Sequence, residues 1–188
     1  MQTYKKKFAE FLVRADALQF GEFTLKSGRS SPYFFNSAKF NTGPLIEELG
    51  SYYAAAIEEN TPNCNLIYGP AYKGIPLASA TAMTLVRDHG HDVGFCFNRK
   101  EAKDHGEGGN LIGSPLSGRV LIIDDVISAG ISICEAVDFI CAAGAKPCGV
   151  IIALDRMEQG NNGLSAIQEI KEMYDIPVIS IINFNCIF

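Results

Sequence analysis

The chain lacks the features of several large classes of protein. No apolar run approaches the length of a membrane span, and no apolar signal region follows the lysine cluster at Lys5 to Lys7. The lysines and arginines form no basic stripe, and the net charge of -5 also argues against a nucleic-acid surface. We therefore expect a cytoplasmic protein that binds neither membranes nor nucleic acid.

The sequence also has little that suggests a protein-held metal or a disulfide framework. Its six cysteines include no C-x-x-C pair, and most of them lie inside apolar runs. This pattern is typical of small buried thiols in a reducing compartment. The three histidines show no metal-ligand spacing, and His89 and His91 flank a glycine in a turn. We expect no metal that is held directly by protein side chains.

The 188 residues do contain a regular alternation of strand-like and helix-like segments, with no repeat or linker. Short apolar runs rich in β-branched residues predict buried strands. They lie at 66–68, 93–98, 120–123, 148–154 and 178–182. Amphipathic periodicity and capping residues predict helices. These lie near the N-terminus, at 45–59 and 75–87, after Gly130, and at 164–174. The pattern indicates an α/β fold with a central mostly parallel sheet and helices on both faces.

The stretch from Gly118 to Ile140 carries the clearest functional signal. A predicted strand, Val120 to Ile123, is closed by Asp124 and Asp125, and two adjacent carboxylates are costly to bury. We expect them to face a hydroxylated, cationic or metal-bound group. The small residues from Ser128 to Ser132 then open a helix whose free amides and dipole can bind phosphate. No lysine follows the glycine, so this is not a P-loop, and the string alone is also compatible with an ordinary capped turn.

Three other segments carry candidate binding groups. The turn from Gly69 to Gly74 follows a predicted strand and holds one lysine, Lys73, where an α/β sheet usually binds its ligand. Arg99 to Gly118 has five glycines, three cations and almost no apolar pattern, which is typical of a lid. Residues 20–40 predict a hairpin with an aromatic second arm. Lys26 and Arg29 supply cations, and Phe34 and Phe35 supply a stacking face, for a flat anionic ring.

The segment from Asp124 to Ser132 resembles the phosphoribosyl pyrophosphate (PRPP) signature of the type I phosphoribosyltransferases. The motif RKEAKDHGEGG, which begins at Arg99, resembles the catalytic loop of the orotate phosphoribosyltransferases in that family. The resemblance runs from the first helix to about Ile182. It implies one domain over 1–188, a small N-terminal hood over about 1–40 and a mobile catalytic loop over about 99–118. It also implies a non-proline cis peptide in the turn that holds Lys73.

The resemblance implies an enzyme of UMP biosynthesis that transfers ribose 5-phosphate from PRPP to orotate, giving orotidine 5-monophosphate and pyrophosphate. Mg2+ would be the cofactor, held mainly by PRPP and water, in a homodimer with shared active sites. PRPP binding would involve Lys26, Tyr72, Lys73, Arg99, Lys100, Lys103, His105, Asp124, Asp125, Val126, Ile127, Ser128, Ala129, Gly130, Ile131 and Ser132. Catalysis would involve Arg99, Lys103, His105, Asp124 and Asp125. Orotate binding would involve Lys26, Phe34, Phe35, Ser128 and Arg156.

Three features depart from the family pattern. Ser128 stands where threonine is usual, which keeps the hydroxyl group. Ile131 replaces a residue that is commonly small or hydroxylated, so only its amide remains for phosphate. Members of the family continue past Phe188 into a further helix, and we therefore expect Phe184, Ile187 and Phe188 to be partly exposed.

Two other functions share the acid pair. A phosphoribosyltransferase for another base would bind a neutral ring and would need neither Lys26 nor Arg156. A PRPP-sensing regulator without enzymatic activity would keep the ribose-phosphate loop and add a nucleic-acid surface. The charge balance disfavours this second alternative.

Overall fold

The computed structural model describes residues 3–24, 30–60, 63–103, 109–127, 130–157 and 163–183. Its centre is a six-stranded sheet with the order β5-β4-β3-β6-β7-β8. Neighbouring strands are parallel except at the β4–β5 pair, which is antiparallel. The strands are β3 (Leu66–Tyr68), β4 (Gly94–Lys103), β5 (Gly109–Gly113), β6 (Arg119–Asp124), β7 (Lys146–Asp155) and β8 (Val178–Asn183).

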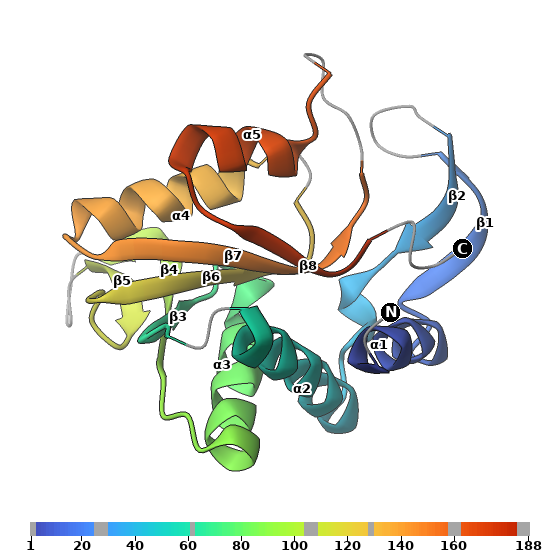
Figure 1. Cartoon of the computed structure of the whole chain (residues 1–188), viewed down its shortest axis with the longest axis horizontal. Helices are drawn as coiled ribbons and strands as arrows, with labels where there is room; N and C mark the ends of the chain where they lie inside the picture. The colour runs from blue at the N-terminus through green and yellow to red at the C-terminus, as the bar shows by residue number, and fades with distance from the viewer. Residues whose placement is uncertain are drawn as a thin grey trace.

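Helices cover both faces of this sheet (Figure 1). On one face lie α1 (Thr3–Arg14), α2 (Gly43–Asn60) and α3 (Gly74–Thr84), and on the other lie α4 (Ile131–Ala142) and α5 (Ala166–Tyr174). Strand side chains alternate between the two faces. In β6, Leu121 belongs to the buried cluster under the first set of helices, and Ile122 belongs to the cluster under the second set. The two-sided burial explains why β6 and β7 are almost uniformly apolar, as the sequence predicts.

The N-terminal region forms a separate two-stranded layer beside the sheet. β1 (Leu18–Thr24) pairs antiparallel with β2 (Ser30–Phe35), so the predicted hairpin is confirmed. On α1, Phe8 and Phe11 are fully buried in the cluster that includes α2, which confirms the predicted amphipathic helix. A 3-10 helix (Ser37–Lys39) then leads from β2 towards α2. We refer to residues 3–24 and 30–40 as the hood.

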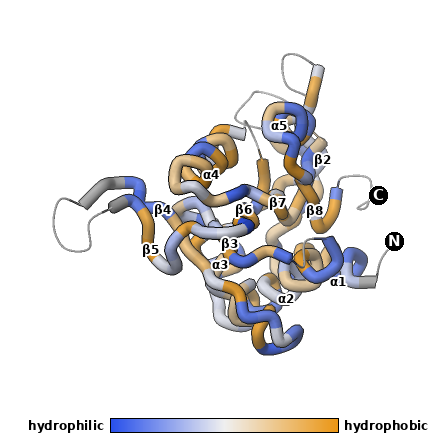
Figure 2. Tube along the Cα trace, turned by 60° about the vertical axis from the view of Figure 1, so that its left-hand side comes forward, coloured by the Kyte–Doolittle hydropathy of each residue, from blue (hydrophilic) through white to orange (hydrophobic). Residues whose placement is uncertain are grey.

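The α/β fold is as predicted, but two segments differ in detail. The connection expected over 99–118 contains strand instead: β4 extends to Lys103, and β5 pairs with it through Asn98↔Leu111 and Cys96↔Gly113. This hairpin lies at the edge of the sheet (Figure 2). Polar residues are tolerated there, and they hide its strand character. The helix predicted over 75–87 is an α-helix only as far as Thr84. It is followed directly by a π-helical turn, Leu85–His89.

Three further expectations concern the cysteines, membrane-spanning helices and the C-terminal residues. Cys64, Cys96 and Cys148 are buried free thiols as expected, whereas Cys141 is exposed on α4. No helix in the part of the chain that the structure describes is long and apolar enough to cross a membrane. The expected exposure of Phe184, Ile187 and Phe188 concerns residues outside the described ranges.

Candidate active site

The two main sequence motifs lie at one place on the sheet, because β3 and β6 are parallel neighbours and both end there. The turn after β3 and the loop after β6 line a common cavity of about 510 Å³. Lys100 from β4 and the first residues of α4 complete its wall. The lining residues are Pro70, Ala71, Tyr72, Lys73, Lys100, Asp124, Asp125, Val126, Ile127, Gly130, Ile131, Ser132 and Ile133.

The turn after β3 is held by backbone contacts and by one side chain from β4. The Ala71–Tyr72 peptide is cis, as the family resemblance implies. The Ala71 amide donates a hydrogen bond to Asn98 Oδ1 at 2.8 Å. A Cβ at Gly69 would lie 2.1 Å from the carbonyl oxygen of Gly74, so this close approach of the two backbones requires glycine. The Tyr72 side chain extends into solvent, and Lys100 Nζ lies 5.4 Å from its ring centroid.

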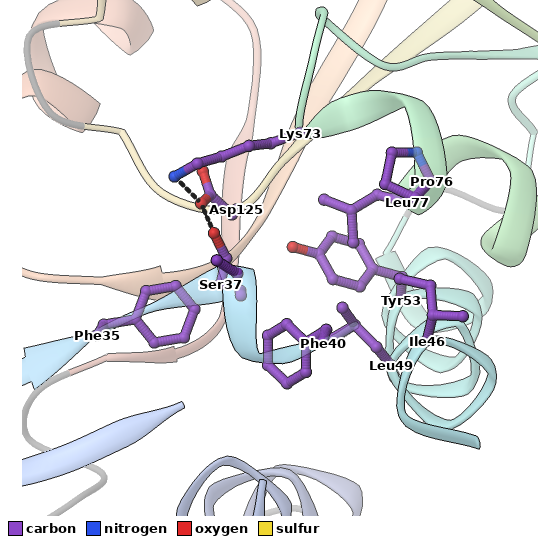
Figure 3. A pocket seen from close by; sticks show the side chains of 12 residues that line it. Phe35, Ser37, Phe40, Ile46, Leu49, Tyr53, Lys73, Pro76, Leu77 and Asp125 are labelled. Atoms are coloured by element: carbon purple, nitrogen blue, oxygen red, sulfur yellow. Dashed lines mark hydrogen bonds and ion pairs between the residues drawn. The ribbon is translucent and has the colours of Figure 1, made fainter. Parts of the chain in front are cut away.

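Asp125 is a buried carboxylate with three donors. Asp125 as a whole residue is only 6% exposed. Oδ1 accepts a hydrogen bond from the Val126 amide at 2.8 Å. Oδ2 accepts from Lys73 Nζ at 2.7 Å and from Ser37 Oγ at 2.5 Å, as Figure 3 shows. Because a buried charge is stable only when it is paired and hydrogen-bonded, these contacts keep Asp125 in place at the cavity wall.

Asp124 lies in a different electrostatic environment, although it is adjacent in the chain. Burial, together with the neighbouring Asp125 charge, raises the pKa of Asp124 to about 7. Its Oδ1 accepts a hydrogen bond from the Asp125 amide at 2.8 Å. The Asp124 carbonyl oxygen accepts from the hydroxyl of Tyr53 at 2.7 Å. Complete burial raises the pKa of Tyr53, so this hydroxyl stays protonated and remains a donor.

Two smaller cavities adjoin the main one. A cavity of about 210 Å³ lies between the hood, α2 and α3, and its wall is mostly apolar (Figure 3). It includes Phe35 and Phe40, and it shares Lys73 and Asp125 with the main cavity. The other, of about 180 Å³, lies beside β4 and is lined in part by Arg99 and Lys100. The buried Arg99 Nε has no hydrogen-bond partner among the described residues, so this guanidinium retains a donor for a ligand.

The structure brings most of the predicted PRPP residues together. Ten of them line the main cavity: Tyr72, Lys73, Lys100, Asp124, Asp125, Val126, Ile127, Gly130, Ile131 and Ser132. Arg99 lines the adjoining cavity beside β4. The predictions for Lys26, His105, Ser128 and Ala129 concern residues outside the described ranges, and the described part of Lys103 includes only its place at the end of β4.

Three of the five residues predicted for the orotate side lie within the described ranges, in different settings. Phe35 lines the apolar cavity. Phe34 is 40% exposed, and its ring centroid lies 5.6 Å from that of Phe23. Arg156 directly follows β7, at the same edge of the sheet as the acid pair. These three side chains line no common cavity among those described above.

Three residues that position this site were not predicted from the sequence: Ser37, Tyr53 and Asn98. Ser37 is separated from Asp125 by 88 residues, and no local pattern links the two. Tyr53 is part of the apolar face of α2, where an aromatic residue predicts only core packing. Asn98 could have been found, because it is a polar residue that follows the apolar part of β4 and lies on the ligand-binding edge of the sheet.

Comparison with known proteins adds a direct result. A family model described as "Phosphoribosyl transferase domain" matches residues 39–178, which include both motifs. The orotate phosphoribosyltransferase of Marinobacter nauticus is 60% identical over 182 residues, covering 97% of this chain and 85% of that protein. That of Methylococcus capsulatus is 55% identical over 184 residues, covering 98% and 86%. The crystal structure of orotate phosphoribosyltransferase from Francisella tularensis aligns with a TM-score of 0.88 at 39% identity, covering 96% of this chain and 87% of that one.

Proposed function

Because the chain belongs to the phosphoribosyl transferase family and, within it, to the orotate phosphoribosyltransferases, we propose that it transfers ribose 5-phosphate from PRPP to orotate. The products are orotidine 5-monophosphate and pyrophosphate, in a step of UMP biosynthesis. One observation carries the assignment of the site: Lys73 and Asp125, 52 residues apart, are joined by a hydrogen bond in the wall of a cavity that both motifs line.

We place PRPP in the main cavity. Asp124 and Asp125 would accept hydrogen bonds from the two ribose hydroxyls. The first amides of α4, those of Ile131 and Ser132, would bind the 5-phosphate, because a helix N-terminus presents free donors and a positive dipole. Lys73 and Lys100 would lie near the pyrophosphate. The side chain of Lys73 is 63% exposed, so its ammonium can turn from Asp125 towards a phosphate.

The reaction replaces the bond from the anomeric carbon to pyrophosphate with a bond to the ring nitrogen of orotate. Positive charge develops on the ribose, and negative charge grows on the departing pyrophosphate. The protein can therefore act by placing the two substrates and by stabilising these charges, without a covalent nucleophile. Cations such as Lys73, Arg99 and Lys103 would neutralise the leaving group, while the catalytic loop would exclude water.

The donor set fits a Mg2+ ion that is bound chiefly through the substrate. No cluster of three or more metal-binding side chains occurs among the described residues, and the carboxylates that line the main cavity are Asp124 and Asp125. Because Mg2+ usually keeps several waters and binds phosphate oxygens, such a site needs few protein ligands. When bound, the ion would reduce the negative charge of the pyrophosphate. Asp124 and Asp125 would orient the ribose hydroxyls next to it.

We propose that orotate is bound by Lys26, Phe34, Phe35, Ser128 and Arg156. The Arg156 guanidinium would pair with the orotate carboxylate, and Phe35 would contact the ring from the hood. Arg156→Leu should raise the dissociation constant for orotate about 30-fold or more, because a carboxylate would lose its charged partner. The PRPP constant should change little. Equal orotate affinity in the two proteins, measured by calorimetry, would reject this role for Arg156.

The decisive test of the reaction is a panel of bases offered with PRPP and Mg2+. We expect pyrophosphate release with orotate, and none with uracil, adenine, guanine or hypoxanthine. Release with a neutral base and not with orotate would identify a different phosphoribosyltransferase. Binding of PRPP without release in any reaction would favour the sensing alternative.

We also propose a cytoplasmic homodimer in which the catalytic loop of each subunit serves the active site of the other. Lys103→Ala and Asp125→Asn homodimers should then both be nearly inactive. After subunit exchange, about half of the dimers combine one variant chain of each kind and contain one intact site. Activity should recover to about a quarter of that of the unaltered enzyme. No recovery, with exchange verified by mass spectrometry, would show that each loop serves its own subunit.

A further inference from the structure

The hood reaches the ribose-binding acid through one hydroxyl group. Ser37 Oγ donates to Asp125 Oδ2 at 2.5 Å. The backbone around Ser37 is fixed: the Asn36 amide donates to the Ala17 carbonyl at 2.8 Å, and Asn36 Oδ1 accepts from the Ala38 amide at 3.1 Å. We propose that Ser37 is a positioning residue that holds Asp125 in its PRPP-binding orientation. This inference rests on the function proposed above.

The three donors to Asp125 do not have equal roles. The Val126 amide contacts only Oδ1, so it does not fix Oδ2. Lys73 contacts Oδ2, but its side chain is 63% exposed, and it also lines the cavity in which we place the pyrophosphate. Once Lys73 turns to the phosphates, Ser37 is the remaining described donor to Oδ2. The side chain of Asp125 is 8% exposed, so water is a poor replacement for this donor.

The contact also joins the two halves of the active site. Ser37 lies two residues after Phe35, which we assign to the orotate side, whereas Asp125 belongs to the PRPP side. Loss of the hydroxyl should therefore weaken PRPP binding first. Since Ser37 is not itself proposed to contact orotate, the KM for orotate at saturating PRPP should stay nearly constant. A general loss of folding would lower both affinities.

The matched variants are Ser37→Thr and Ser37→Val, which have nearly the same shape and differ mainly in the hydroxyl. The cavity of about 210 Å³ that Ser37 lines has room for the added methyl group. A hydrogen bond to a charged group is strong enough that its loss should weaken binding about tenfold or more. We expect Ser37→Thr to bind PRPP with Mg2+ within about threefold of the unaltered protein, and Ser37→Val to bind about tenfold more weakly.

Calorimetry with PRPP and Mg2+ measures the affinities, and steady-state kinetics separates the KM for PRPP from kcat. In an Asp125→Asn background, the Thr and Val variants should bind PRPP equally, because the charged acceptor is gone. Equal affinities in the Asp125 background would overturn the role of Ser37 while leaving the proposed function intact. Absence of PRPP binding by the unaltered protein would overturn both. Ser37→Ala also lacks the hydroxyl but adds no bulk, so it should bind PRPP as weakly as Ser37→Val; tight binding by Ser37→Ala would show that the valine acts through its size.

Discussion

The carboxyl group of Asp124, which we assign to PRPP binding, lowers the stability of the folded protein. Its carboxyl group is enclosed beside a second carboxylate, which raises its pKa from 3.8 to about 7. Asp124→Asn removes the charge but keeps a side-chain oxygen that can accept the hydrogen bond from the Asp125 amide, now 2.8 Å long. We therefore expect this variant to be more stable than the unaltered protein at pH 8, and to bind PRPP less tightly.

The size of the expected gain in unfolding free energy follows from proton linkage. Between pH 3.8 and about 7, folded Asp124 holds a proton that the unfolded chain has lost, so its contribution to stability falls as the pH rises. Above about pH 7 the full penalty is present. A shift of about three units at about 1.36 kcal/mol each corresponds to about 4 kcal/mol. Partial exposure of the group reduces this value, and we expect the variant to gain about 2 to 4 kcal/mol at pH 8.

Urea unfolding at two pH values provides the assay. At pH 8 the midpoint for Asp124→Asn should rise by about 1 M or more, given a typical dependence of about 2 kcal/mol per M. At pH 4.5 the advantage should shrink to about 1 kcal/mol, because the folded unaltered protein is then protonated. Asp92→Asn removes an exposed carboxylate and is the control, with little change at either pH. A variant that is no more stable at pH 8, or an advantage at pH 4.5 as large as that at pH 8, would refute this electrostatic explanation.

Three further predictions concern the scaffold of the site. Gly69→Ala would place its Cβ 2.1 Å from the Gly74 carbonyl oxygen, so PRPP affinity should fall at least tenfold. In the control Gly43→Ala the new Cβ meets no atom within 4 Å, so that affinity should not change, and similar affinities in the two variants would contradict the packing argument. Tyr53→Phe removes the donor to the Asp124 carbonyl and should lower the free energy of unfolding by about 1 kcal/mol, measured in urea; an unchanged midpoint would show that the bond contributes nothing. Asn98→Ala frees the Ala71 amide and should raise the PRPP dissociation constant several-fold with little effect on the melting temperature, whereas an unchanged constant would exclude this role.

The fold was largely predictable because its strands are buried on both faces. A strand such as β6 alternates between two apolar clusters, so every residue from Val120 to Ile123 is apolar, and the run is recognisable without its neighbours. The β4–β5 hairpin lacks this signal. It lies at the sheet edge, and pairing such as Asn98↔Leu111 depends on the backbone rather than on an apolar pattern. Strand pairing of this kind is not encoded in local composition.

The candidate site likewise has one part that the sequence predicts and one part that it does not. Its ligand-facing groups lie in two short motifs, so the turn around Lys73 and the acids Asp124 and Asp125 could be identified from adjacent residues. The groups that hold those motifs in place come from distant parts of the chain. Ser37 belongs to the hood and Tyr53 to α2, and each contact exists only after the domain has folded. Nothing near Ser37 in the sequence indicates that its hydroxyl faces a carboxylate.

Because β4 and β5 pair antiparallel, the connection between them can change in length independently of the rest of the sheet. Lys103 and Gly109 are directly opposite each other in the hairpin, so the connection between them begins and ends at adjacent points on one edge of the sheet. Added residues there would break no parallel crossover, because the two strands pair antiparallel. Each doubling in length of such a connection changes the closure entropy by only about 0.6 kcal/mol. The length of this connection can therefore change while the six-stranded sheet retains its register.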